Sequence, residues 1–155
     1  MAQRRAVVVP FEAEPRRRLI GVKLVSVPRH TDARGSLIAL DEDQSLPFDV
    51  RRVYCICQSS AGAVRGEHAT SAHCALVALE GTVEVDVDNG EDRDNIQLSR
   101  MDQVLCLHAG VWLRLFNFTQ GAIVLVASSQ RYAESSYYDR PFPELLCGAE
   151  HDRWQ

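Results

Sequence analysis

The feature that most constrains the fold of this sequence is a succession of short apolar runs, the clearest of which is V-E-V-D-V-D at residues 83–88. Valine alternates there with an acidic residue at every step, and a period of two is typical of a β-strand with one buried face. The Asn89–Gly90 pair follows at once, and it favours a tight hairpin turn because both residues tolerate positive φ. This stretch therefore predicts two antiparallel strands joined by a short turn.

Comparable short runs recur at 20–30, 34–43, 48–58, 74–82 and 95–128, with turn residues between them. Helical periodicity is found only near residues 131–146. Many short strands at regular spacing indicate a closed sandwich or barrel. The sequence thus predicts an all-β fold, with a short helical or irregular segment at its C-terminal end. We expect a single domain over residues 19–147, a loose N-terminal segment at 1–18 and a flexible tail at 148–155.

Size and charge exclude several classes of function. A chain of 155 residues suits one domain with a substantial core. The net charge is −4 and the chain has no long basic stripe, which argues against nucleic-acid binding. No apolar run approaches the roughly 20 residues of a membrane span, and residues 1–15 lack a signal-peptide core. These features predict a cytoplasmic protein.

The chain contains five cysteines, an odd number that argues against a disulfide framework in a chain without a secretory signal. Cys55 and Cys57 form a C-x-C pair in a strand-like run, and alternation places both on one face. We predict that they are small buried residues rather than a metal or redox pair.

The stretch G-A-V-R-G-E-H-A-T-S-A-H, residues 62–73, resembles part of a metal-binding motif. Gly62, His68 and Gly81 stand at the spacing of the first cupin signature, G-x5-H-x-H-x3-E-x6-G, and Gly110 and Asn117 fit the second, G-x5-P-x-G-x2-H-x3-N. The chain therefore resembles the cupin superfamily. The resemblance implies a double-stranded β-helix, that is, a jelly-roll barrel.

In many cupins the remaining signature positions complete a metal site, and here they are changed. Thr70, Cys74 and Leu113 stand at those positions, so His68 is the one imidazole that remains. A tight zinc site normally has three or four convergent donors, and leucine has no lone pair to offer. We therefore predict no metal. The alternative to this prediction is a zinc site rebuilt from His68, Cys74 and a displaced His73 or His108.

A narrower resemblance covers about residues 22–146. The blocks at 31–37, 47–54, 65–69 and 126–138 are similar to the family pattern D-x-R-G-x-L, P-F-x-x-x-R-V-Y, R-G-x-H-A-H and L-A-S-x-x-Y-x-E-x-D-Y. This is the pattern of the WxcM-like sugar nucleotide 3,4-ketoisomerases, which act on dTDP-4-keto-6-deoxyglucose. The resemblance implies an isomerase for deoxysugar biosynthesis that uses neither metal nor cofactor.

The family's reaction moves a carbonyl from C4 to C3 of the sugar through an enediol. It needs a base of near-neutral pKa, for which histidine is suited, and donors for the developing oxyanion. His68 matches the first histidine of the family's H-A-H pair. Tyr54 and Arg65 match polar residues of the same pocket, so the resemblance assigns these three side chains to catalysis.

Four further residues are expected to bind the substrate. Arg34 and Arg52 match positions that could meet the nucleotide diphosphate, since a guanidinium suits phosphate oxygens. Thr70 and Asn117 complete the set. Arg34 could instead form a structural ion pair with Asp32 or Asp41.

The main departure from the family is Thr70, which stands in place of the second histidine. If alternation holds, His68 and Thr70 both point into the barrel, but threonine cannot act as a base at neutral pH. A relative that binds a nucleotide sugar without turnover is therefore the alternative function. The resemblance also implies a homodimer, which could exchange an N-terminal strand between subunits.

Overall fold

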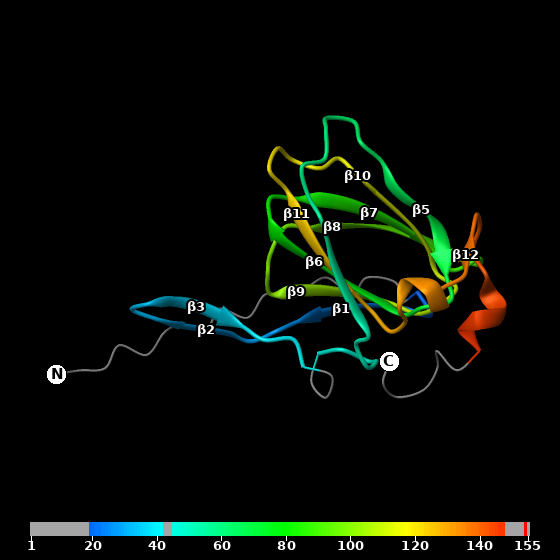
Figure 1. Ribbon diagram of the computed structural model, residues 1–155, viewed down its shortest axis with the longest axis horizontal. Helices are drawn as coiled ribbons and strands as arrows, with labels where there is room; N and C mark the ends of the chain where they lie inside the picture. The colour runs from blue at the N-terminus through cyan, green and yellow to red at the C-terminus, as the bar shows by residue number, and fades with distance from the viewer. Residues whose placement is uncertain (1–18, 42–44, 148–153, 155) are drawn as a thin grey trace.

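The structure is a computed structural model that describes residues 19–41, 45–147 and 154. Two five-stranded antiparallel sheets face each other and form a barrel, and a separate two-stranded hairpin extends from it (Figure 1). The first sheet has the order β1-β9-β6-β11-β4 and the second the order β12-β5-β10-β7-β8. This arrangement confirms the predicted all-β cupin jelly roll.

The first sheet and the hairpin contain these strands: β1 Val22–Ser26, β9 Gln103–Leu107, β6 Cys74–Glu80, β11 Ile123–Ser128, β4 Arg52–Ile56, β2 Arg29–Asp32 and β3 Gly35–Ile38. The second sheet contains β12 Tyr137–Tyr138, β5 Arg65–Thr70, β10 Trp112–Phe116, β7 Val83–Asp88 and β8 Arg93–Leu98. β7 and β8 pair as an antiparallel hairpin, as predicted, with Asp88 opposite Arg93. The connection is a four-residue loop, residues 89–92, in which Gly90 but not Asn89 has positive φ.

Two apolar layers hold the barrel together, one on each face of the first sheet. The inner layer fills the space between the sheets with fully buried side chains such as Val83, Val85 and Leu105. The outer layer, which includes Val104 and Phe48, is covered in part by the segment before β4. Burial of apolar area on both faces of one sheet explains why its central strand β6 is a nearly continuous apolar run.

The prediction for the C-x-C pair was wrong, because Cys55 and Cys57 are both exposed. β4 is an edge strand, and its side chains alternate strictly in exposure. Arg52, Tyr54 and Ile56 take the inward positions. The cysteines have the opposite parity and therefore face outward.

The described C-terminal part consists of short elements, which confirms the predicted short helical or irregular segment. It has one turn of 3-10 helix at Tyr132–Glu134, the strand β12, and a second turn at Pro143–Leu146. Residues 1–18 and most of the expected tail lie outside the described residues. Trp154, the described residue of that tail, stacks on Phe48 with ring centroids 6.4 Å apart. Within the described parts of the chain, no helix is long and apolar enough to cross a membrane.

Candidate active site

A cavity of about 230 Å³ lies between the two sheets, and both contribute side chains to its wall. The second sheet supplies residues of β5, β10 and β12, and the first supplies residues of β4, β6 and β11. The polar or ionisable side chains of the lining are Arg52, Tyr54, Arg65, His68, Thr70, Cys74, Ser128, Ser135 and Tyr137. The remainder is mostly aliphatic, so a few polar groups converge in an otherwise apolar pocket.

A β-bulge in β5 sets the direction of the side chains on one wall. Leu113 of β10 pairs with His68 and Arg114 pairs with Gly66, so Glu67 is an extra residue with no partner in this register. Gly66 and Glu67 have φ values of 80° and 59°, in the left-handed region. Arg65 and His68 are three positions apart, and strict alternation would place them on opposite faces. The bulge shifts the parity by one, so both line the cavity.

The bulge also fixes the tautomer of His68. The Gly66 carbonyl lies 3.0 Å from Nδ1 of His68 and can accept a hydrogen bond only if that nitrogen carries a proton. Nε2 is then the nitrogen with a free lone pair. Burial lowers the pKa of His68, against the Gly66 hydrogen bond, which raises it. The imidazole is therefore neutral at pH 7 and able to accept a proton.

Two neighbours of His68 complete this wall. The ring of Tyr137 lies edge-on to the imidazole, with ring centroids 5.0 Å apart. Thr70 is buried, and its Oγ1 accepts a hydrogen bond from the Ala72 amide at 3.2 Å. The Thr70 hydroxyl proton is thus left to donate to a ligand.

The opposite wall carries groups that keep their protons. Burial raises the pKa of Tyr54 to about 12, with a smaller contribution from Cys74. Burial likewise raises the pKa of Cys74 to about 11, against its hydrogen bond with Ser128. Both side chains are neutral hydrogen-bond donors near pH 7, and neither is a base there.

Two guanidinium groups, those of Arg52 and Arg65, supply positive charge. The Arg52 guanidinium lies between two aromatic rings, 4.4 Å from the centroid of Tyr54 and 5.0 Å from that of Tyr132. Among the described residues, neither arginine forms a salt bridge with a carboxylate. An arginine at a cavity without a carboxylate partner is suited to an anionic ligand.

The structure brings together five of the seven predicted site residues: Arg52, Tyr54, Arg65, His68 and Thr70. It does not bring Asn117 to the cavity. Asn117 is exposed at the end of β10 and donates from Nδ2 to Glu84 at 3.0 Å. Its φ of 51° explains why asparagine fits there, since asparagine tolerates the left-handed region. Asn117 therefore matches the cupin signature at a position with left-handed backbone, and its side chain does not line the cavity.

Arg34 is also absent from the cavity of this chain. It lies at the turn of the β2–β3 hairpin, its side chain is 90% exposed, and it pairs with Asp32. The ion pair with Asp32, which was the alternative for this residue, is present in the structure.

Sequence reasoning missed Tyr137, Ser128 and Ser135 as cavity residues. Tyr137 lies within a block that matches the family pattern, which was the available signal. The two serines lie in the same block, residues 126–138. They reach the cavity through the end of β11 and the approach to β12.

The lining does not offer a donor set for a metal ion. Within the described residues, no group of three or more histidine, cysteine, aspartate or glutamate side chains could hold one. The rebuilt zinc site would need either His73 or His108, and these two rings instead pack against each other with ring centroids 4.3 Å apart. Neither lines the cavity.

Comparison with known proteins decides the family. Residues 20–142 match the family described as FdtA, WxcM-like, C-terminal. The chain belongs to this family.

Other members of the WxcM-like family are similar over most of their length. The TDP-4-oxo-6-deoxy-alpha-D-glucose-3,4-oxoisomerase of Aneurinibacillus thermoaerophilus is 31% identical over 116 residues, which cover 74% of this chain and 84% of that protein. The structure of the WlaRB TDP-quinovose 3,4-ketoisomerase from Campylobacter jejuni superposes with a TM-score of 0.75 at 31% identity, covering 83% of this chain and 99% of that one. A variant of the QdtA 3,4-ketoisomerase from Thermoanaerobacterium thermosaccharolyticum, in complex with TDP, gives a TM-score of 0.74 at 30% identity, covering 79% and 90%.

Proposed function

We propose that this protein is a metal-independent 3,4-ketoisomerase that acts on a dTDP-linked 4-keto-6-deoxyhexose in deoxysugar biosynthesis. One observation carries the proposal: the His68 imidazole, with Nδ1 held against the Gly66 carbonyl, lines a cavity that also holds two guanidinium groups. The similar Thermoanaerobacterium enzyme has been crystallised as a variant with TDP-4-keto-6-deoxyglucose, which supports this substrate class. A cytoplasmic location is part of the same proposal.

The chemistry follows from the placement of the groups. Nε2 of His68 takes the C3 proton, which the C4 carbonyl acidifies, and an enediol forms. Hydrogen-bond donors on both walls, among them Tyr54, Arg65 and Thr70, stabilise the charge on the sugar oxygens. A proton added to C4 then completes the transfer of the carbonyl to C3.

Incubation with dTDP-4-keto-6-deoxyglucose tests the function directly. We expect a 3-keto product and exchange of the C3 hydrogen with solvent deuterium, both followed by NMR. Thr70, in place of a second imidazole, favours the alternative of a protein that binds the nucleotide sugar without turnover. Binding of dTDP without either exchange or product would support that alternative.

The pH dependence of kcat/KM should show the neutral imidazole as the active form. Because burial lowers the pKa of His68 below 6.5, we expect kcat/KM to fall as the pH is lowered through this depressed value, and to be level near pH 7. Measurement of kcat/KM from pH 5 to pH 8 would show this fall. A midpoint above 6.5 would contradict the assignment of the base.

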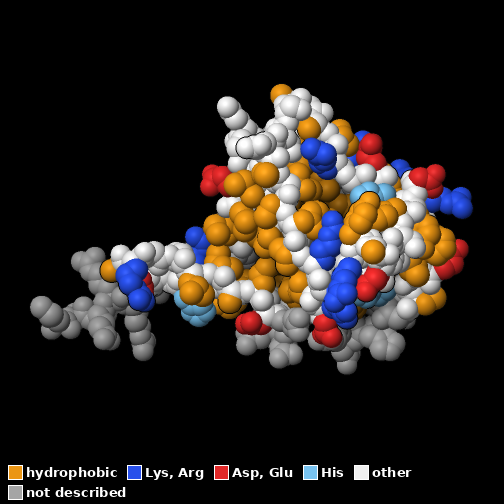
Figure 2. Space-filling view, in the orientation of Figure 1, with side chains coloured by type: hydrophobic (Ala, Val, Ile, Leu, Met, Phe, Trp, Pro, Cys, Tyr) orange, Lys and Arg blue, Asp and Glu red, His pale blue; other side chains and the backbone are white. Residues whose placement is uncertain are grey.

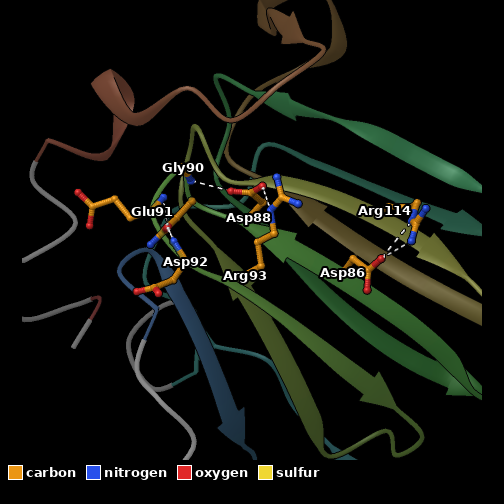
Figure 3. Close-up of polar contacts among 8 residues, drawn as sticks. Asp86, Asp88, Gly90, Glu91, Asp92, Arg93 and Arg114 are labelled. Atoms are coloured by element: carbon orange, nitrogen blue, oxygen red, sulfur yellow. Dashed lines mark hydrogen bonds and ion pairs between the residues drawn. The ribbon is translucent and has the colours of Figure 1, made fainter.

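Loss of either cavity arginine should weaken dTDP binding. A charge-assisted hydrogen bond contributes about 1.5–3 kcal/mol, so we expect Arg52→Ala and Arg65→Ala each to raise the Kd by roughly 10- to 150-fold in titration calorimetry. Arg93→Ala is the control, because Arg93 is 85% exposed and pairs with Asp88 at the β7–β8 turn (Figure 3). Equal Kd values for all three variants and the wild type would remove Arg52 and Arg65 from the phosphate site.

We also infer that the protein is a homodimer. All residues of β2 and most of β3 are exposed, and Leu37 on this hairpin is 61% exposed. Hydrophobic side chains gather on the face of the barrel beside the hairpin (Figure 2). Val53, on the edge strand β4, is 57% exposed. β1 pairs with β9 of its own chain and leaves its other edge unpaired in the described residues. A second copy would cover Leu37 and the exposed apolar face of the barrel, and in the proposed dimer it would bring Arg34 to the partner's substrate.

Light scattering at micromolar concentration should therefore give about twice the chain mass of 17.3 kDa. Leu37→Asp should shift the mass toward that of one chain, because it places a charge in the proposed contact. A monomeric mass for the wild-type protein would overturn the dimer and, with it, the role of Arg34.

A further inference from the structure

A second and larger groove lies on the outer face of the second sheet, on the side away from the cavity. Its volume is about 740 Å³, within the range of about 300–1,000 Å³ that ligand sites commonly have. Strands β7, β8 and β10 form its floor, and residues 139–141, which follow β12, form its wall. The groove and the cavity between the sheets are lined by different residues. The groove is therefore separate from the proposed ketoisomerase site.

The parity of β7 and its register with two neighbours place polar side chains side by side on the floor of the groove. The valines of β7 point into the barrel, so Asp86 points outward. Asp86 lies opposite Arg114 of β10 on one side and opposite Asn95 of β8 on the other. Trp112 stands two residues before Arg114 and shares its face, about 7 Å along the strand. An indole ring and a row of three polar groups thus form one continuous floor.

The polar row is held in place by its own contacts and keeps further hydrogen-bonding capacity. Asp86 accepts at Oδ2 from Nε and Nη2 of Arg114, at 3.1 and 2.5 Å (Figure 3), and at Oδ1 from Nδ2 of Asn95 at 2.7 Å. A carboxylate has about four lone-pair sites and a guanidinium has five N–H groups. Among the described residues, these contacts leave acceptor sites on Asp86 and N–H donors on Arg114 unused. The row therefore presents donors and acceptors of fixed position to the groove.

The wall of the groove is fixed to the barrel at both of its ends. Tyr138 pairs with Ala69 of β5 before it, and after it the Phe142 amide donates to the Gly110 carbonyl at 2.9 Å. The ring of Tyr138 also stacks on that of Phe142, with centroids 4.3 Å apart. Arg140, on this wall, is exposed and has no hydrogen-bond or ion-pair partner among the described residues. Because floor and wall are both anchored, little ordering of the protein is needed when a ligand binds.

The charges of the groove select a neutral ligand with hydroxyl groups. Four aspartates and three arginines line it, which leaves one net negative charge. A phosphate or a strongly basic ligand would therefore meet no excess of opposite charge. A sugar ring has hydroxyl groups that both donate and accept, and its apolar C–H face suits an indole ring. Trp112 is half-buried, and its Nε1–H has no hydrogen-bond partner among the described residues.

We propose that this groove binds neutral pyranose sugars, with Trp112 stacked on a sugar ring and with Asp86 and Arg114 hydrogen-bonded to its hydroxyl groups. The Asp86 carboxylate accepts from one hydroxyl group, and the Arg114 guanidinium donates to a neighbouring one. Because the groove is open and leaves part of the ligand in water, we expect a Kd on the order of 1 mM. The site does not depend on the proposed ketoisomerase function.

The chain has two tryptophans, which allows a direct test of the groove. In Trp154→Phe, Trp112 is the remaining indole, so its fluorescence reports binding at the groove. The probes are methyl β-D-glucopyranoside, methyl β-D-galactopyranoside and methyl α-L-rhamnopyranoside, each titrated to about 50 times the expected Kd. We expect a saturable change in emission with at least one of them. The absence of a saturable change with all three would overturn the proposal.

Two further substitutions, made in the Trp154→Phe protein, test the polar row against a matched control. Asp86→Asn and Glu84→Gln each remove one negative charge from the outer face of β7, but Glu84 accepts from Asn117 at 3.0 Å and does not line the groove. We expect Asp86→Asn to raise the Kd for the sugar by about tenfold or more, because a charge-assisted hydrogen bond is lost, and Glu84→Gln to leave it unchanged. Arg114→Gln should raise the Kd for the same reason. Equal Kd values in all these proteins would overturn the assignment of the groove.

Competition with dTDP distinguishes the groove from the cavity between the sheets. The diphosphate of dTDP is proposed to meet the arginines of the cavity, so we expect the Kd for the sugar to be the same with and without saturating dTDP. Loss of the sugar signal on addition of dTDP would place the sugar in the cavity and overturn the proposal. Failure of sugar binding at the groove would leave the proposed ketoisomerase function intact, because the two sites share no lining residue.

Discussion

Replacement of His68 by asparagine is expected to lower kcat for isomerisation by about 10²–10⁴-fold, the range attributed to general acid–base catalysis. His68 is the one base that the described lining offers near pH 7, so no neighbour can take over its role. Exchange of the C3 hydrogen with solvent deuterium should be lost together with product formation. The measurement is NMR in D2O with dTDP-4-keto-6-deoxyglucose.

Asparagine is the informative substitution because its amide can still donate a hydrogen bond toward the Gly66 carbonyl. The bulge should therefore persist, and the Kd for dTDP should change little. An intact Kd with lost exchange would assign the defect to proton transfer. Exchange at the wild-type rate in His68→Asn would contradict the role of His68.

The second large effect is expected from Gly66→Ala, which alters no cavity side chain. Gly66 has a φ of 80°, which costs a residue with a Cβ about 1–2 kcal/mol. A Cβ there would also lie 2.9 Å from the backbone oxygen of Leu113, which cannot move as a flexible side chain would. The bulge must shift, and the position of His68 with it. Since a displacement of about 1 Å can lower a rate by about 10²-fold, we expect a loss of that order in kcat/KM.

Gly62→Ala is the matched control for this prediction. Gly62 also has positive φ, at 76°, but a Cβ there would meet no atom within 4 Å. Gly62→Ala should reduce the free energy of unfolding by about 1–2 kcal/mol, which is the part of the Gly66→Ala effect that comes from positive φ. It should leave kcat/KM near the wild-type value. Equal activities of the two variants would show that the bulge does not position His68.

Much of the fold could be predicted from the sequence because its strands have one buried face. The alternation in β7 specified its inward side chains, and the Asn89–Gly90 turn specified its partner strand. The spacing of Gly62, His68 and Gly81 pointed to a cupin barrel, and the family pattern grouped most of the site. These features are local, so a single sequence is sufficient to show them.

The same local rule failed where the burial of a strand depends on its neighbours. Alternation correctly placed Cys55 and Cys57 on one face, but it could not say which face was buried. That depended on β4 being an edge strand, with Arg52 and Tyr54 turned toward the cavity. The signature match of Asn117 likewise gave no information on whether the side chain reaches the site.

The sequence by itself determined the barrel, the family and the one imidazole, because side-chain type and strand period are properties of the chain alone. The tertiary structure decided which of these groups meet. An unpaired Glu67 puts Arg65 and His68 on one face, and the Gly66 carbonyl selects the ring nitrogen that can act as the base. The register between β5 and β10 and the direction of the Gly66 carbonyl exist only once the two strands are paired. They cannot be read from the residue types of either strand alone.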